Sequence, residues 1–338
     1  MDLHVFWFVL LGVLLTGYAI LDGFDLGVGI LHLSVRRDDE RRTLLNAIGP
    51  LWDGNEVWLV TFGGALFAAF PHTYATAFSA FYEPFMALLF ALIFRAVSIE
   101  FRSKRESRVW RQFWDVCFCA ASGLATFLFG VAVGSTMRGI PIGPDREFAG
   151  TFVSLIGAYP LLVGVLAVAT FAMHGSIYLY LKTEGELQAR VHRWMWRTFG
   201  IFLVLYMLTT IYTLATMPQA IRNFSAIPWA WLVVVLNVLA VANIPRAIFL
   251  GRPLYAFVSS SCTIVALTFL FGVALFPDLL VSTLNPEWSL TVYNAASSEK
   301  TLGIMRTFAL LGMPFVAGYT AVVYWVFRGK VRLGRLSY

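Results

Sequence analysis

The chain places two carboxylates, an amide and two tryptophans at the start of an apolar run, in the stretch Gly49-Pro50-Leu51-Trp52-Asp53-Gly54-Asn55-Glu56-Val57-Trp58-Leu59. The apolar run continues to Phe70. A charged side chain at membrane depth costs about 2.5–3.5 kcal/mol, so such groups usually face protein or water and often serve a function. A second acidic stretch, Asp22-Gly23-Phe24-Asp25, occurs earlier in the chain. We interpret the rest of the chain as a helical bundle that holds these two stretches side by side.

The composition is that of a membrane protein from end to end. Of the 338 residues, 59% are hydrophobic and only 13% are charged, and the mean hydropathy is +0.74. These values lie far from those of soluble globular domains, in which about 25% of the residues are charged. The formal net charge is +6, but the basic residues fall in short loops between apolar runs. This pattern is typical of membrane proteins and argues against a nucleic-acid partner.

Nine apolar runs are long enough to cross a bilayer, which takes about 20 mostly apolar helical residues. The predicted fold class is therefore an all-α integral membrane protein with nine transmembrane helices, in a single polytopic domain over residues 1–338. The predicted spans are 6–31, 53–70, 74–99, 114–135, 154–180, 198–217, 228–249, 255–276 and 304–327. The residues before the first run lack a basic region, so we expect a retained first helix and not a cleaved signal peptide.

The basic residues alternate between the two ends of the predicted bundle. Most of the 25 lysines and arginines follow the first, third, fifth, seventh and ninth spans. Because cytoplasmic loops carry an excess of Lys and Arg, this pattern predicts a periplasmic N-terminus and a cytoplasmic C-terminus. A plan with eight spans would break the alternation. The longest outer segments, 136–153 and 277–303, are rich in Pro, Gly, Asp and Asn and are expected to hold a little structure of their own.

The two acidic stretches are predicted to meet near the cytoplasmic end. Asp22 and Asp25 are three residues apart and share a helix face late in the first span. Asp53 and Glu56 have the same spacing at the start of the second span. One interpretation is a cluster that conducts protons or coordinates a cation. The other is a pair of helix-end carboxylates, because Pro50 followed by acidic residues is a favourable helix N-terminus.

The glycines and tryptophans beside these acids suggest how the helices pack. Gly23 and Gly27 form a small-xxx-small pair, which predicts close helix packing. Trp52 and Trp58 fit the role of anchors at the membrane interface. Trp58 lies nearly two turns deeper, at about 3.6 residues per turn, and therefore also fits the lining of a route for a small ligand.

The third predicted span carries further charged residues near both ends. Arg95, Glu100 and Arg102 close it, where snorkelling and ion pairing account for them. Glu83-Pro84 lies near its outer end, and the proline predicts a kink. Glu83 fits either a proton exit or a satisfied polar contact.

The sequence shows no motif for a cofactor, a metal or catalysis within this chain. His174 is the only histidine well inside a predicted span, and a lone histidine is a weak candidate for a haem or metal ligand. There is no HExxH motif, Walker motif or dinucleotide-binding glycine pattern. The cysteines Cys117, Cys119 and Cys262 lack metal-ligand spacing and fit ordinary buried thiols.

Several stretches closely resemble the hallmark stretches of subunit II of cytochrome bd quinol oxidases. The first is Leu21-Asp22-Gly23-Phe24-Asp25-Leu26-Gly27-Val28-Gly29, and the second is the run over 49–59 quoted above. Shorter likenesses occur over 63–71, 94–102 and 174–185. The first two motifs together are specific, and the chain length and nine-span plan also fit.

This resemblance implies a membrane complex that oxidises quinol and reduces dioxygen to water in the bacterial inner membrane. It implies that two haems b, one haem d and the quinol loop belong to subunit I. This chain would be the haem-free partner, with two four-helix bundles plus one peripheral helix. The family also includes members with a small single-helix subunit and members with a structural quinone in subunit II.

The resemblance further implies roles for individual residues. It assigns Asp53 to a proton path from the cytoplasm, with Asp22 and Asp25 in the same region, and we add Glu56 to that path. It places Trp58 along a dioxygen route. Two other classes of protein stay open at this point. A secondary transporter or ion channel would use the same four carboxylates, whereas a purely structural scaffold would tolerate replacement of all four.

Overall fold

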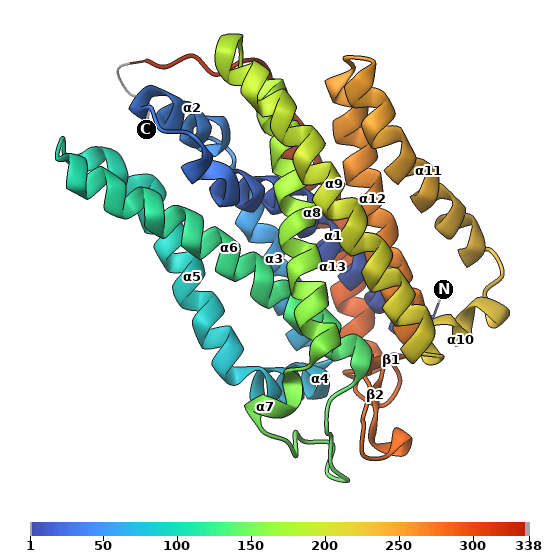
Figure 1. Ribbon diagram of the computed structural model, residues 1–338. Helices are drawn as coiled ribbons and strands as arrows, with labels where there is room; N and C mark the ends of the chain where they lie inside the picture. The colour runs from blue at the N-terminus through green and yellow to red at the C-terminus, as the bar shows by residue number, and fades with distance from the viewer. Residues whose placement is uncertain (1, 335–338) are drawn as a thin grey trace.

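The protein is almost entirely helical in the computed structural model, which describes residues 2–334 (Figure 1). Within that part of the chain, eight helices are long and apolar enough to cross a membrane. They are α1 (Leu3–Leu31), α5 (Tyr82–Phe101), α6 (Arg108–Arg138), α8 (Ala158–Lys182), α9 (Gly185–Thr216), α11 (Ala230–Phe249), α12 (Pro253–Leu275) and α13 (Glu299–Val326). The predicted all-α membrane class is confirmed.

The structure departs from the predicted spans in the region of the acidic motif. α3 (Trp52–Ala69) has 18 residues and occupies the predicted second span, but it carries two carboxylates near its start and is not among the eight. The predicted span 74–99 is divided into α4 (Pro71–Ala80) and α5, with Phe81 between them. Pro84 therefore lies in the first turn of α5, where its missing N–H leaves no hydrogen bond broken. The expected kink at this proline is wrong, because a new helix begins here.

Short elements connect the long helices. They are η1 (His32–Ser34), α2 (Asp38–Ile48), η2 (Arg102–Lys104), α7 (Phe152–Leu155), α10 (Gln219–Ala226), β1 (Asp278–Leu280), η3 (Pro286–Trp288) and β2 (Leu290–Thr291). The strands β1 and β2 pair antiparallel. The segment after α6 joins them, because Ile140 donates its N–H to Val281 O at 2.9 Å and accepts from Thr283 N at 3.0 Å. The two outer segments that were expected to hold a little structure therefore pack on each other.

α1 lies at the centre of the bundle. It contacts α3, α6, α8, α12 and α13, while α5 packs on α6, α9 packs on α8, and α11 packs on α12. The backbones of α1 and α8 meet at Gly27 and Gly175. A Cβ added at Gly27 would lie 1.9 Å from Phe171 O, so only glycine allows this crossing. The close packing predicted from the glycine spacing is confirmed here.

The loops that follow α1, α5, α8 and α13 meet at one end of the molecule, at the top of Figure 1. Arg190 of α9 forms an ion pair with Glu40 of α2. Lys182 at the end of α8 donates to Phe327 O after α13 at 2.5 Å. At the opposite end, the ring of His4 lies 5.5 Å from that of Tyr293. The chain therefore gathers its basic loops on one side, which is the arrangement that the alternation of charge requires.

Candidate functional site

A buried ion cluster lies where α1, α3 and α5 meet. Arg95 of α5 is fully buried, and its Nη1 donates to Asp22 Oδ2 at 2.8 Å and to Glu56 Oε1 at 2.9 Å. Its Nη2 donates to the second oxygen of Asp22, so the guanidinium binds that carboxylate with both arms of its fork. Asp22 is fully buried as well, whereas the side chain of Glu56 is 26% exposed. Glu56 is therefore the member of this cluster that reaches outward.

A second carboxylate of α1 has no such counter-ion. Asp25 is fully buried, and its Oδ2 accepts from Asn55 Nδ2 at 2.7 Å. Its other oxygen is buried and meets no hydrogen-bond partner among the described residues. Asn55 also accepts at Oδ1 from the hydroxyl of Tyr324 at 2.9 Å. A chain of hydrogen bonds thus runs from α13 through Asn55 to Asp25.

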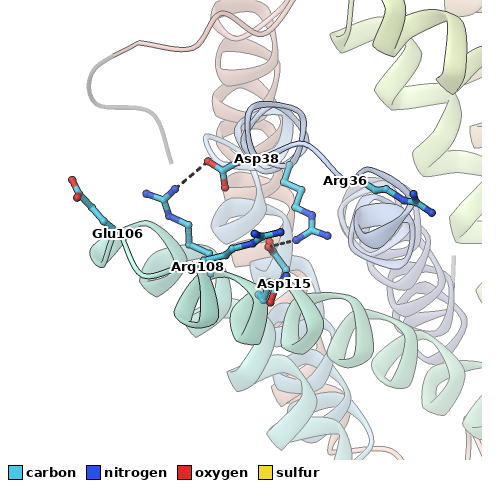
Figure 2. A pocket seen from close by; sticks show the side chains of 8 residues that line it. Arg36, Asp38, Glu106, Arg108 and Asp115 are labelled. Atoms are coloured by element: carbon cyan, nitrogen blue, oxygen red, sulfur yellow. Dashed lines mark hydrogen bonds and ion pairs between the residues drawn. The ribbon is translucent and has the colours of Figure 1, made fainter.

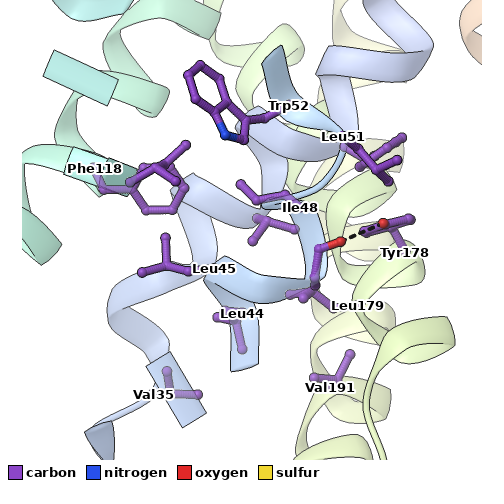
Figure 3. Close-up of a cluster of buried hydrophobic side chains, with 14 of the residues drawn as sticks. Val35, Leu44, Leu45, Ile48, Leu51, Trp52, Phe118, Tyr178, Leu179 and Val191 are labelled. Carbon is purple, nitrogen blue, oxygen red and sulfur yellow. Dashed lines mark hydrogen bonds between the residues drawn. The ribbon is translucent and has the colours of Figure 1, made fainter. Parts of the chain in front are cut away.

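The start of α3 is held in place by an apolar cluster beneath it (Figure 3). Leu51 and Trp52 pack in the same cluster as Ile48 of α2 and Phe118 of α6. Tyr178 of α8 donates its hydroxyl to Ala47 O at 2.7 Å, close to the end of α2. These contacts fix the turn between α2 and α3 and thereby position Asn55 and Glu56 one turn further on.

Asp53 lies outside the buried cluster, although the sequence grouped it with Glu56. It is exposed on α3, whereas Asn55 of the same turn is 3% exposed and faces α1. Trp58 lies between α3 and α1 and is half-buried. Its ring fills the space beside Gly17, where an added Cβ would lie 2.3 Å from Trp58 Cε3.

The other candidates are spread along the helices. Arg95 does not reach toward a helix end as a snorkelling side chain would, because its charge is satisfied inside the bundle. Glu100, one turn further along α5, is half-buried. Glu83 is exposed in the first turn of α5, at the opposite end of that helix from Glu100. The structure therefore brings together Asp22, Asp25, Glu56 and Arg95, whereas Glu83 and Glu100 lie outside this cluster.

His174 is a buried polar contact between three helices. One ring nitrogen, Nδ1, lies 2.7 Å from Ser260 Oγ of α12, and Nε2 lies 3.1 Å from Ile20 O of α1. The ring also stacks on Phe257 with 4.8 Å between the centroids. Both nitrogens are thus engaged within the chain, and neither is available to a haem iron. Among the described residues, no group of three His, Cys, Asp or Glu side chains is placed to hold a metal ion.

A second buried ionic cluster lies closer to the basic end, and sequence reasoning missed it. Asp115 of α6 is 1% exposed. It contacts His32 Nε2 at 2.5 Å, Arg102 Nε at 2.6 Å and Arg41 Nη1 at 2.8 Å. Asp38 of α2 adds contacts of 2.8 Å to Arg102 and 3.2 Å to the Arg111 side chain. Asp115 itself was the signal in the sequence. It is an acidic residue just inside an apolar run, and a charged group at that depth needs a buried partner.

This second cluster forms the floor of an open cleft of about 410 Å³ (Figure 2). Its walls come from the turn after α1, from α2 and from the first turns of α6. The lining residues are Arg36, Asp38, Arg41, Glu106, Arg108, Arg111, Gln112 and Asp115. Within the cleft, Asp115 of α6 pairs with Arg41 of α2, and Asp38 of α2 pairs with Arg111 of α6, so the cluster ties α2 to α6.

The fold and the site together define an all-α membrane-spanning protein with buried charged clusters near one end of its bundle. The family model described as cytochrome bd terminal oxidase subunit II matches residues 3–327. The chain therefore belongs to the cytochrome bd terminal oxidase subunit II family. The resemblance found in the two acidic motifs is confirmed.

Individual relatives agree with this assignment. The chain is 35% identical to cytochrome bd-I ubiquinol oxidase subunit 2 of Escherichia coli (strain K12), with 97% of this chain and 95% of the relative covered. It is 35% identical to cytochrome bd ubiquinol oxidase subunit 2 of Bacillus subtilis (strain 168), with 98% and 97% covered. Its fold is similar to that of a chain in the bd oxidase from Geobacillus thermodenitrificans, with a TM-score of 0.79, 17% identity, and 97% and 99% of the two chains covered.

Proposed function

We propose that this chain is the haem-free subunit of a quinol oxidase in the bacterial inner membrane. In this role it supports the haem-bearing subunit I and takes up protons from the cytoplasm for the reduction of dioxygen. The family assignment supports a place for this chain in a quinol oxidase complex, and it argues against a transporter or ion channel. The proposed plan is two four-helix bundles, made of α1, α3, α5 and α6 and of α8, α9, α11 and α12, plus α13. It is supported by the contacts within each group, such as those of α5 with α6 and of α11 with α12, and the two groups meet through α8, which packs on α1 and α6. The observation that carries the proton path is the buried cluster around Arg95.

The charges of the cluster support a role in proton transfer. Asp22, Asp25 and Glu56 are three carboxyl groups around one guanidinium, and that guanidinium bonds to only two of them. An ionised Asp25 would be a buried charge without a counter-ion, which is costly. The protonation of Asp25 therefore depends strongly on its neighbours, as a group that takes up and releases a proton requires.

The hydrogen bonds suggest the order of the path. Glu56 is partly exposed and receives the proton from outside the cluster, and Arg95 links it electrostatically to the acids of α1. Asp25 holds the proton further in, with Asn55 and Tyr324 fixing its carboxyl. Asp53 lies on the exposed face of α3, where it serves as an entry group or faces subunit I.

We further propose that Trp58 lies along a route by which dioxygen passes through this subunit. Its ring lies between α1 and α3 against Gly17, so it lines the boundary between these helices inside the bundle. A small apolar molecule passing along that boundary would meet this ring. Phe is smaller than the indole that fills this space, so replacing Trp58 with Phe is expected to widen the boundary and lower the apparent KM for dioxygen while leaving the haem content unchanged.

The proton path is tested by replacing Asp25 with Asn in the complex purified from its native membrane. Asn keeps the size and the hydrogen bond to Asn55 but cannot carry a proton. Oxygen consumption is expected to fall by about 100-fold or more, the scale of a lost proton-transfer group. The reduced-minus-oxidised bands of haems b and d report whether the complex is intact.

A matched control is Asp39→Asn, an acid on the exposed face of α2 that pairs with Arg37. Salt-bridge formation with Arg37 lowers the pKa of Asp39, and the side chain stays at the surface. Its replacement should leave oxygen consumption unchanged. Wild-type turnover in Asp25→Asn would refute the proton path, and loss of the haem bands would assign Asp25 a structural role.

A further inference from the structure

The segment after α13 folds back over the end of α8. Gly329 has a φ of +109°, a value that suits glycine, and the chain turns there. Val331 then donates its N–H to Lys182 O at 2.8 Å. Lys182 Nζ donates in return to Phe327 O at 2.5 Å, and Lys330 Nζ donates to a carbonyl of α8 at 3.1 Å. These bonds hold the segment against the bundle at the end where α2 lies (Figure 1).

A pocket of about 270 Å³ forms between this segment, the end of α8 and the turn that leads from α2 to α3. Four of its described lining residues are basic and none is acidic. The basic ones are Lys182, Arg328, Lys330 and Arg332. Two apolar residues, Val326 and Phe327, complete the side that adjoins α13.

The cleft in Figure 2 lies at the same end of the bundle and differs from this pocket in that it contains acidic side chains. There, Arg41 and Arg111 each meet a carboxylate, Asp115 and Asp38. That cleft therefore sets three acidic side chains among its four basic ones, and two of its arginines are paired within the protein. In the pocket beside α13, the ammonium groups of Lys182 and Lys330 donate to backbone carbonyls and lie over tyrosine rings of α8, and no carboxylate of the described residues forms an ion pair with either of them.

Several cations held around one cavity repel one another, and an anion bound between them would remove that cost. Desolvation lowers the pKa of Lys330, which lies outside the membrane-spanning helices, and a bound anion would oppose this shift. The pocket also adjoins the end of α13, where the apolar helix gives way to basic residues. Basic pockets beside transmembrane helices on the cytoplasmic side are suited to anionic lipid headgroups.

We propose that the pocket formed by Lys182, Arg328, Lys330 and Arg332 binds a phosphate group, supplied by the headgroup of an anionic phospholipid of the inner leaflet. The phosphate lies among the basic side chains, and the acyl chains run along α13 beside Val326 and Phe327. A free phosphate ion shares the chemistry of the headgroup but not the acyl chains. The two sources are therefore separated by experiment.

The test uses the purified complex and its affinity for fluorescent phosphatidylglycerol in neutral detergent micelles. The double variant Arg328→Gln/Arg332→Gln removes two charges, and the three bonds that hold the segment come from other groups. It is expected to bind the probe roughly 30-fold more weakly, the effect of losing two basic side chains near an anionic lipid. The matched control Arg36→Gln/Arg108→Gln removes two charges from the cleft in Figure 2 and should bind normally.

Competition identifies the source of the phosphate. Unlabelled phosphatidylglycerol should displace the probe, while phosphatidylcholine and millimolar inorganic phosphate should not. Displacement by inorganic phosphate as strong as by the lipid would support the phosphate site and assign it to a soluble anion. Equal displacement by phosphatidylcholine, unchanged affinity in the double variant, or an equal loss in the control variant would each overturn the proposal. The haem bands and the elution volume of each variant complex show whether it is assembled. The single variant Arg332→Gln repeats the test with a smaller change and is expected to weaken binding of the probe about 5-fold.

Discussion

Replacing Arg95 with Gln is the sharpest test of the buried cluster, because one side chain there neutralises two carboxylates. The change removes both hydrogen bonds to Asp22 and the one to Glu56, and it leaves Asp22 buried without a counter-ion. Breaking one partner of a buried pair costs about 3–5 kcal/mol. Domains are stable by only about 5–15 kcal/mol, so we expect a large drop in thermal stability or a failure to assemble.

The assay is thermal unfolding of the purified complex, together with the yield of assembled complex in detergent. Arg37→Gln is the matched control, because Arg37 also binds a carboxylate through two nitrogens, at 3.1 and 2.6 Å, but at the surface. It should leave stability nearly unchanged, since exposed ion pairs contribute little. The double variant Arg95→Gln/Asp22→Asn removes both charges together and should recover most of the loss. Equal effects of Arg95→Gln and Arg37→Gln, or no recovery in the double variant, would refute the reasoning.

Three further changes test other parts of the structure. Tyr324→Phe removes the hydroxyl that donates to Asn55, so turnover should fall several-fold at full haem content, as measured by oxygen uptake. Gly27→Ala places a Cβ within 1.9 Å of Phe171 O, and the overlap should abolish assembly, as read from the yield of complex. Asp115→Ala leaves two buried or half-buried arginines and the buried His32 without their carboxylate, so α2 should detach and become sensitive to limited proteolysis at the basic end.

Each of these changes has a control or a contrary outcome. Gly12→Ala lies in the same helix as Gly27, and an added Cβ there meets nothing within 4 Å, so this variant should assemble normally. A functional Gly27→Ala complex would show that the two helix backbones do not meet as described. Unchanged turnover in Tyr324→Phe would remove α13 from the proposed path. Proteolysis of α2 that is the same in Asp115→Ala and wild type would show that the apolar cluster alone holds it.

The apolar pattern predicted most of the helices because a membrane helix satisfies its backbone within itself and needs only length and hydropathy. It failed at the start of the third span, where α4 ends at Ala80 and α5 begins at Tyr82. Both pieces are apolar, so hydropathy runs through the break. The nearby Pro84 marked the site, but a proline is compatible with a kink and with a helix start.

The acidic motifs were visible in the sequence, and their partners were not. Spacing alone placed Asp22 and Asp25 on one helix face. The same argument grouped Asp53 with Glu56, yet the structure leaves Asp53 exposed and turns Asn55 toward α1. Residues three apart lie about 60° from each other around a helix, at about 3.6 residues per turn, so one can lie at the buried side of a face and the other at its exposed margin.

The sequence by itself determined the membrane class, the basic end of the chain, the close packing at Gly27 and the family, because these depend on composition and local spacing. Tertiary structure decided which groups meet. Arg95 pairs with Asp22 across 73 residues, and Tyr324 reaches Asn55 across 269. Such contacts depend on the rotation and crossing of whole helices, which no local pattern specifies. The physical reason is that a buried charge accepts any suitable partner within reach, and only packing decides which partner is there.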